Sequence, residues 1–186
     1  ANDEAALRND FVSKTEAQEG DPRRPSVVPV GVVELEFGDG VELVSGELNL
    51  AGGVATVNMT NPSGEGQVRL VMDMNANVLA IDGARAPEFT VQRRPAWDQL
   101  GEYLASVRFE PPTMFSEDDY EGWVQPLPVD PSVCLGYADG DERQLLVAIE
   151  RGENVEAAKD AVKAELADLS YNDVAESAAD WWAAYW

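Results

Sequence analysis

Histidine is absent from this sequence of 186 residues, and cysteine occurs only once. The lack of histidine excludes, within the chain, nucleophiles activated by histidine, histidine metal sites and histidine general acids. The single cysteine, Cys134, cannot form an internal disulfide bond. Because it lies in the apolar, strand-like run 132–137, we predict that its thiol packs in a hydrophobic core.

Basic residues are scarce: 13 Lys and Arg stand against 35 Asp and Glu, which gives a net charge of −22 at pH 7. Such a chain repels the phosphate backbone of nucleic acids and the surface of anionic membranes, so neither is expected as a partner. This acidity is typical of a secreted or periplasmic bacterial protein, and a merely well-solvated domain explains it equally well.

Long hydrophobic runs are also missing. No stretch approaches the ~20 apolar residues of a membrane span, and the first residues do not form a charged and then apolar signal peptide. The chain starts at Ala1 instead of a methionine, which is compatible with a removed leader. We therefore predict an exported protein, periplasmic or extracellular, without a segment inside the membrane.

The length suits one domain with flanking helices. Changes in composition predict a polar arm at 1–28, in which 5–17 forms a short helix. They predict a β-sandwich at 29–152, interrupted by an aromatic and proline-rich insertion at 94–131, and linker helices at 153–186.

Short runs with a period of two residues dominate the first half of the chain. In Val33-Glu34-Leu35-Glu36-Phe37 the alternation predicts a half-buried strand whose glutamates face water. The turn Gly38-Asp39-Gly40 predicts a tight hairpin to a second strand at 41–50, bulged at Ser45-Gly46. Glycine, asparagine and proline turns join such runs, as in an antiparallel sandwich. Further strands are predicted at 54–59, 68–74, 78–81, 89–91, 133–137 and 144–150.

The insertion at 94–131 contains the aromatic residues Trp97, Tyr120 and Trp123 among several prolines. Long structured loops often carry function, and aromatic rings stack on the C–H faces of sugars, so these three residues are candidate carbohydrate-binding residues. Tryptophans are more often buried anchors, and that alternative stays open.

The many acids do not by themselves indicate catalysis. Glycosidases use two carboxylates, but 35 acids form close pairs by chance, so no catalytic residue is assigned. The run Glu117-Asp118-Asp119 with Glu121 offers hard oxygens for calcium but lacks the spacing of a calcium loop, which favours a solvated loop. No cofactor and no metal ion are predicted, and no phosphate-binding loop supports a nucleotide site.

Two helices are predicted after residue 153. Asn154 caps the first, and Ser170 with Asp173 forms a capping box at the start of the second. The second helix ends in four aromatic residues that cover more than one stripe of its surface. We predict that they dock on a further domain and touch their own domain on one side only. They are Trp181, Trp182, Tyr185 and Trp186.

Four segments together resemble the amino-terminal β-sandwich of glycoside hydrolases with a six-hairpin (α/α)6 barrel. The first three are the strand at 31–37, the segment Gly-Glu-Leu-Asn-Leu-Ala-Gly-Gly-Val at 46–54, and Val-Arg-Leu-Val-Met-Asp-Met-Asn-Ala-Asn-Val-Leu at 68–79. The fourth, Asp-Trp-Trp-Ala-Ala-Tyr-Trp at 180–186, is similar to the Asp-Trp-Trp-x-x-Phe-Trp segment of that family. The family's aspartate and alanine are replaced here by Asn49 and Met74.

The resemblance implies a mainly β fold, an antiparallel β-sandwich of the super-sandwich type followed by two C-terminal linker helices. It also implies a non-catalytic domain that packs beside an absent (α/α)6 catalytic barrel, whose substrate is a carbohydrate. The chain by itself is then no enzyme, because that family's catalytic carboxylates lie in the barrel. The alternative is a free-standing carbohydrate-binding or adhesive sandwich module.

Overall fold

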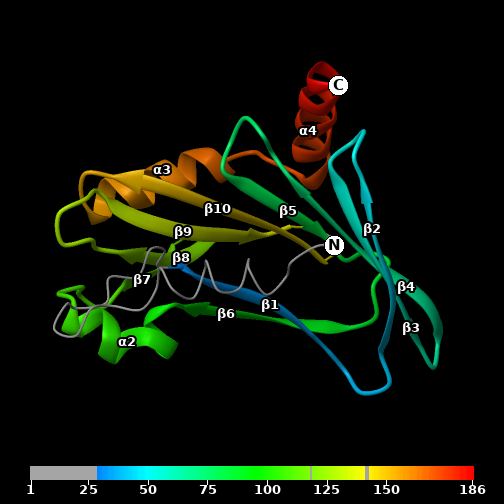
Figure 1. The fold of residues 1–186 in the computed structure, drawn as a ribbon, viewed down its shortest axis with the longest axis horizontal. Coiled ribbons are helices and arrows are strands. Elements are labelled where there is room, and N and C mark those ends of the chain that lie inside the picture. Colours follow the sequence, from blue (N-terminus) through cyan, green and yellow to red (C-terminus); the bar gives the residue numbers. More distant parts are fainter. Residues whose placement is uncertain (1–28, 118, 141–142) are drawn as a thin grey trace, which may run out of the picture.

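The computed structural model describes residues 29–117, 119–140 and 143–186, so the arm at 1–28 and its predicted helix lie outside the described residues. The fold is mainly β and antiparallel, with two sheets and two helices near the C-terminus, which confirms the predicted fold class (Figure 1). The elements are β1 (Gly31–Phe37), β2 (Glu42–Asn49), β3 (Val54–Asn61), β4 (Gly64–Met72), β5 (Val78–Asp82), β6 (Phe89–Pro95), α2 (Trp97–Ser106), β7 (Thr113–Glu117), β8 (Tyr120–Gln125), β9 (Ser132–Asp139), β10 (Gln144–Gly152), α3 (Val155–Leu166) and α4 (Tyr171–Tyr185).

The larger sheet has eight strands in the order β2-β3-β4-β5-β10-β9-β8-β7, and the smaller is a ribbon of β1 and β6. Helix α3 packs on β8, β9 and β10, while α4 packs on β4, β5 and β10. Figure 1 shows α3 and α4 above the larger sheet and the ribbon below it. The central strands of the larger sheet are therefore covered by helices on one face and by the ribbon on the other.

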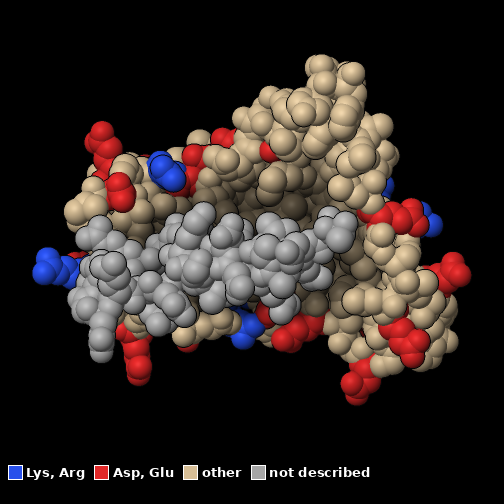
Figure 2. Space-filling view, viewed as in Figure 1, with Lys and Arg blue, Asp and Glu red and all other residues tan. Residues whose placement is uncertain are grey.

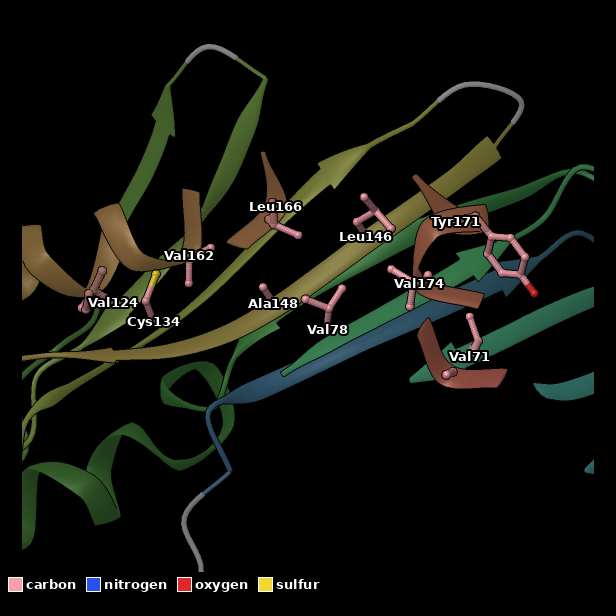
Figure 3. Packing of buried hydrophobic residues seen from close by; sticks show 13 residues of the cluster. Val71, Val78, Val124, Cys134, Leu146, Ala148, Val162, Leu166, Tyr171 and Val174 are labelled. Carbon is pink, nitrogen blue, oxygen red and sulfur yellow. The ribbon is translucent and has the colours of Figure 1, made fainter. Parts of the chain in front are cut away.

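Alternating side chains of the central strands build two cores. Val78 and Ala80 of β5 face the helices, where they join Leu146, Val162 and Val174 (Figure 3). On the opposite face, Ile81, Trp123 and Leu145 pack against the ribbon residues Val33, Leu35 and Val91. Because successive residues of a strand point to opposite faces, strands buried on both sides consist of nearly continuous apolar runs.

The predicted hairpin at Gly38-Asp39-Gly40 is wrong. Strand β1 pairs with β6, and β2 pairs with β3 in the other sheet, so the turn carries the chain from one sheet to the other. A turn signal reports a local change of chain direction, not which strands pair after it. The alternation in β1 is confirmed: Glu34 and Glu36 are exposed, while Val33 and Leu35 face the core.

The insertion at 94–131 contains regular structure that was not expected from its composition. It forms α2 and the hairpin of β7 and β8, and β8 pairs with β9 inside the larger sheet. The prolines lie at element ends or between elements: Pro95 ends β6, and Pro126 follows β8. Proline therefore separates these elements without interrupting them.

Both predicted caps of the last two helices are confirmed. The Asn154 side chain accepts a hydrogen bond from the backbone N–H of Ala157 at 3.0 Å. Ser170 and Asp173 form the predicted capping box at the start of α4. None of the helices within the described residues combines the length and the apolar character that a membrane span needs.

Candidate functional site

Helix α4 is anchored to the larger sheet by its first half. Tyr171, Val174 and Ala178 are buried against it. The Ser177 hydroxyl donates to the carboxylate of Asp73 in the β4–β5 turn at 3.0 Å, which fixes the helix beside that turn. Beyond these contacts α4 projects past the end of the sheet, and its C-terminus lies at the top of Figure 1.

The projecting part of α4 carries Trp181, Trp182, Tyr185 and Trp186, which we call the aromatic end. Trp181 stacks on Tyr185, with ring centroids 5.1 Å apart and an interplanar angle of 12°. Trp182 stacks in the same way on Trp186, at 6.0 Å and 20°. Residues four apart are neighbours on a helix surface, so the four rings form two parallel rows.

One side of the aromatic end rests on the turn between β2 and β3. The indole N–H of Trp186 donates to the backbone carbonyl of Leu50 at 3.0 Å. Trp182 lies so close to Gly53 that a Cβ added there would be 2.3 Å from the indole nitrogen. The contact between this turn and α4 was not predicted, because no pattern in one sequence relates residues so far apart.

The other side of the aromatic end faces solvent. Tyr185 is 62% exposed and Trp186 is 71% exposed. In Figure 2 the projecting end of the molecule shows no Lys, Arg, Asp or Glu on the visible face. The aromatic end thus touches its own domain at the β2–β3 turn and leaves Tyr185 and Trp186 largely exposed.

Gly53 offers a direct test of the contact with the turn. Its φ of 66° is unfavourable for other residues, and its missing side chain leaves room for Trp182. We expect Gly53→Ala to displace the Trp182 ring and to lower the free energy of unfolding by about 1–2 kcal/mol. Urea unfolding followed by tryptophan fluorescence measures both effects.

Gly46→Ala in β2 of the same hairpin is the matched control, because a Cβ there meets no atom within 4 Å. Equal stability of the Gly53→Ala and Gly46→Ala variants would contradict the close contact between the turn and α4.

The structure does not bring the three predicted sugar-binding residues together. Trp123 is 0% exposed, and its indole N–H donates to the carbonyl of Val30 at 3.0 Å, so it cannot stack on a sugar. Tyr120 packs against the core on the helix side of the sheet, and half-buried Trp97 begins α2. The prediction for Trp123 is wrong because a tryptophan in a buried strand was read as a loop residue.

The acidic residues Glu117 and Glu121 are likewise divided between the two faces of the larger sheet. Glu117 binds Lys159 and Lys163 of α3, and these hydrogen bonds lower the pKa of its carboxyl. Glu121 accepts a hydrogen bond from the hydroxyl of Tyr137 at 2.9 Å. Asp118 lies outside the described residues. Within the described ranges, the structure has no group of three or more Asp, Glu, Cys or His residues that could hold a metal ion.

The only cysteine of the sequence is a core residue, as predicted. Cys134 is fully buried among Val124, Ala148 and Val162. Burial raises the pKa of its thiol to about 12. A thiol that stays protonated at neutral pH and has no exposed surface is not a nucleophile.

No protein-family model matches this sequence, and no curated protein matches it either.

Proposed function

We propose that this β-sandwich is the non-catalytic N-terminal domain of an exported bacterial glycoside hydrolase, and that its aromatic end docks on the (α/α)6 catalytic barrel of that enzyme. The observation that carries the proposal is the one-sided packing of the aromatic end. Trp186 contacts the β2–β3 turn through its indole nitrogen, yet it is 71% exposed. The resemblance of residues 180–186 to the segment that leads into such a barrel agrees with this role.

The chemistry of the aromatic end is that of a protein interface. Tryptophan and tyrosine are enriched among the residues that dominate binding energy, because they bury a large area and lose little conformational entropy. Contiguous exposed apolar surface on a soluble domain marks an interaction site. Here the surface belongs to a helix anchored by Tyr171 and Val174, so it is presented rigidly.

The two stacked rows also indicate which kind of partner fits. Trp181 with Tyr185 and Trp182 with Trp186 form ridges along positions four residues apart. Ridges of this kind pack into the grooves of a second helix. A barrel built of helical hairpins supplies such grooves, and in this proposal the carbohydrate binds in that barrel.

The electrostatics of the described acids support a non-catalytic role. A glycosidase needs a carboxylic acid whose pKa is raised, so that it can donate a proton. Each described carboxyl group with a clear shift, namely Asp82, Glu117 and Asp173, has its pKa lowered. In all three cases hydrogen bonds favour the ionised form, which suits structural ion pairs and caps.

Two polypeptides test the proposal: the 186-residue chain, and the product of its natural reading frame extended beyond Trp186. We expect the first to hydrolyse no glycoside and the second to hydrolyse at least one glycan in a panel. Turnover by the 186-residue chain alone, or a reading frame that stops at Trp186, would contradict the proposal.

A substitution at Tyr185 separates docking from folding. In the 186-residue chain we expect Tyr185→Ser to lower the free energy of unfolding by less than about 1.5 kcal/mol. The ring is 62% exposed, and the substitution removes mainly its stacking on Trp181. In the longer polypeptide we expect the same substitution to lower the free energy of unfolding by about 2 kcal/mol or more, because it removes a residue buried in the interface.

Thermal unfolding of both polypeptides measures this difference. Val129→Ser is the control, because Val129 is 92% exposed and lies outside α4. An equal cost of Tyr185→Ser in the two polypeptides would show that nothing docks on the ring.

A further inference from the structure

Strand β2 is an open edge of the larger sheet. It pairs with β3, and no other described strand lies beside it. All eight residues of β2 are exposed, including three large aliphatic ones: Leu43 at 73%, Val44 at 63% and Leu48 at 61%. An edge strand with free backbone N–H and C=O groups and apolar side chains is a template for pairing with another strand.

A β-bulge gives this edge an unusual pattern. The pairing of β2 with β3 shifts between Leu43 and Ser45, so Val44 is the additional residue. Leu43 pairs with Met59 and Leu48 pairs with Ala55, two positions on the same face of β3. The bulge therefore places Leu43 and Leu48 on one face of β2, although their sequence separation is odd.

We propose that β2 pairs antiparallel with β2 of a second copy of this chain, about a two-fold axis at Gly46. In this register Leu43 lies opposite Leu48 of the second copy on both sides of the axis, and four leucines form one apolar strip. Gly46 lies opposite its own counterpart, where the absence of any atom within 4 Å of an added Cβ shows that the position is open.

The charges of β2 permit this register. Its two acids, Glu42 and Glu47, lie opposite Asn49 and Ser45 of the second copy, so no acid directly faces an acid. Like charges directly opposite each other would destabilise the pairing. The net charge of −22 on each copy still opposes association of the two copies. Salt screens this repulsion. We therefore expect a weak dimer that forms at high ionic strength.

The opposite edge of the sheet does not offer the same surface. Strand β7 has five residues, and its last one, Glu117, is held by Lys159 and Lys163 of α3. Met114 of β7 is exposed to a similar degree as the leucines of β2, at 59%. It therefore provides a matched control. This inference does not rest on the proposed function, because it uses the free edge of β2 and none of the aromatic rings of α4.

Sedimentation velocity of the 186-residue chain tests the dimer. At about 0.2 mM protein we expect a monomer in 0.1 M NaCl and a dimer in 1 M NaCl, where the Debye length falls to about 3 Å. The double variant Leu43→Lys/Leu48→Lys should remain monomeric in 1 M NaCl, while Met114→Lys should dimerise like the parent chain. Circular dichroism checks that both variants fold.

Cysteine cross-linking tests the register. Under oxidising conditions in 1 M NaCl, Gly46→Cys should form a covalent dimer. Leu43→Cys alone should not, because its counterpart lies more than about 10 Å away, but it should cross-link when mixed with Leu48→Cys. Buried Cys134 does not interfere. A monomer at 1 M NaCl, a dimer that survives Leu43→Lys/Leu48→Lys, or equal self-cross-linking of Leu43→Cys and Gly46→Cys would overturn the proposal.

Discussion

Replacing Trp123 with alanine is expected to lower the free energy of unfolding by about 3–5 kcal/mol, because it removes a large, fully buried side chain. The ring is 0% exposed and packs in the core between the larger sheet and the ribbon, where it meets the Tyr137 ring edge-on with the ring centroids 6.5 Å apart. The substitution also leaves the carbonyl of Val30 without the indole donor. Urea unfolding followed by circular dichroism measures the loss.

Two further variants control for this prediction. Met114→Ala removes an exposed apolar side chain from a strand of the same sheet and should change stability by less than about 0.5 kcal/mol. Trp123→Phe keeps an aromatic ring, so its free energy of unfolding should lie between those of the parent chain and of Trp123→Ala. A Trp123→Ala variant that keeps its stability but loses glycan binding would contradict the role of Trp123 as a core residue. It would instead support Trp123 as a carbohydrate-binding residue.

Replacing Arg69 with methionine is expected to lower the free energy of unfolding by about 2–3 kcal/mol at pH 7. Arg69 donates from Nε to the Asp82 carboxylate at 3.0 Å and lies over the Tyr171 ring at 5.1 Å. Asp82 has only 6% of its side chain exposed and would remain as an unpaired buried charge. The cost stays below the roughly 3–5 kcal/mol of a fully buried pair because Arg69 is 41% exposed.

The same pair predicts a pH dependence. Burial of Asp82 works against its ionised form, but hydrogen bonds from the Ala84 backbone and from Arg69 outweigh it, so the pKa of Asp82 is lowered. A carboxyl group with a lowered pKa stabilises the fold above the pKa of unfolded aspartate, about 3.9. This contribution disappears as the pH falls through the lowered pKa of the folded state.

The stability difference between the parent chain and Arg69→Met should therefore shrink when urea unfolding is repeated at successively lower pH below about 4. Arg94→Met removes the exposed pair with Glu34 and should cost less than about 1 kcal/mol throughout. A difference for Arg69→Met that is independent of pH would contradict the assignment of the effect to ionised Asp82.

Local patterns in the sequence predicted local structure well. The alternation in 33–37 and the caps at Asn154 and Ser170 depend on neighbouring residues, and the structure confirms all three. Strand pairing depends on distant residues, so the partner of β1 was predicted wrongly. The same limit applies to Trp123, whose burial depends on the ribbon of β1 and β6, and both of these strands lie far from it in the sequence.

For the aromatic end, the sequence predicted the kind of surface but not the part of the fold beneath it. The apolar residues on more than one stripe of the helix predicted contact on one side, and the exposed Tyr185 and Trp186 agree with that expectation. The β2–β3 turn as the surface beneath them was not predictable from a glycine pair alone. Its role follows from the positive φ of Gly53 and the position of Trp182 beside it.

Hydrogen–deuterium exchange of residues 178–186 tests the central claim most directly, when it is compared between the 186-residue chain and the polypeptide extended through its natural reading frame. If the aromatic end docks on a second domain, backbone amides of this segment should exchange at least about tenfold more slowly in the longer polypeptide, which corresponds to about 1.4 kcal/mol of added protection. Amides of β9, in the core of the sheet, should exchange alike in both. Equal exchange of residues 178–186 in the two polypeptides would contradict the account.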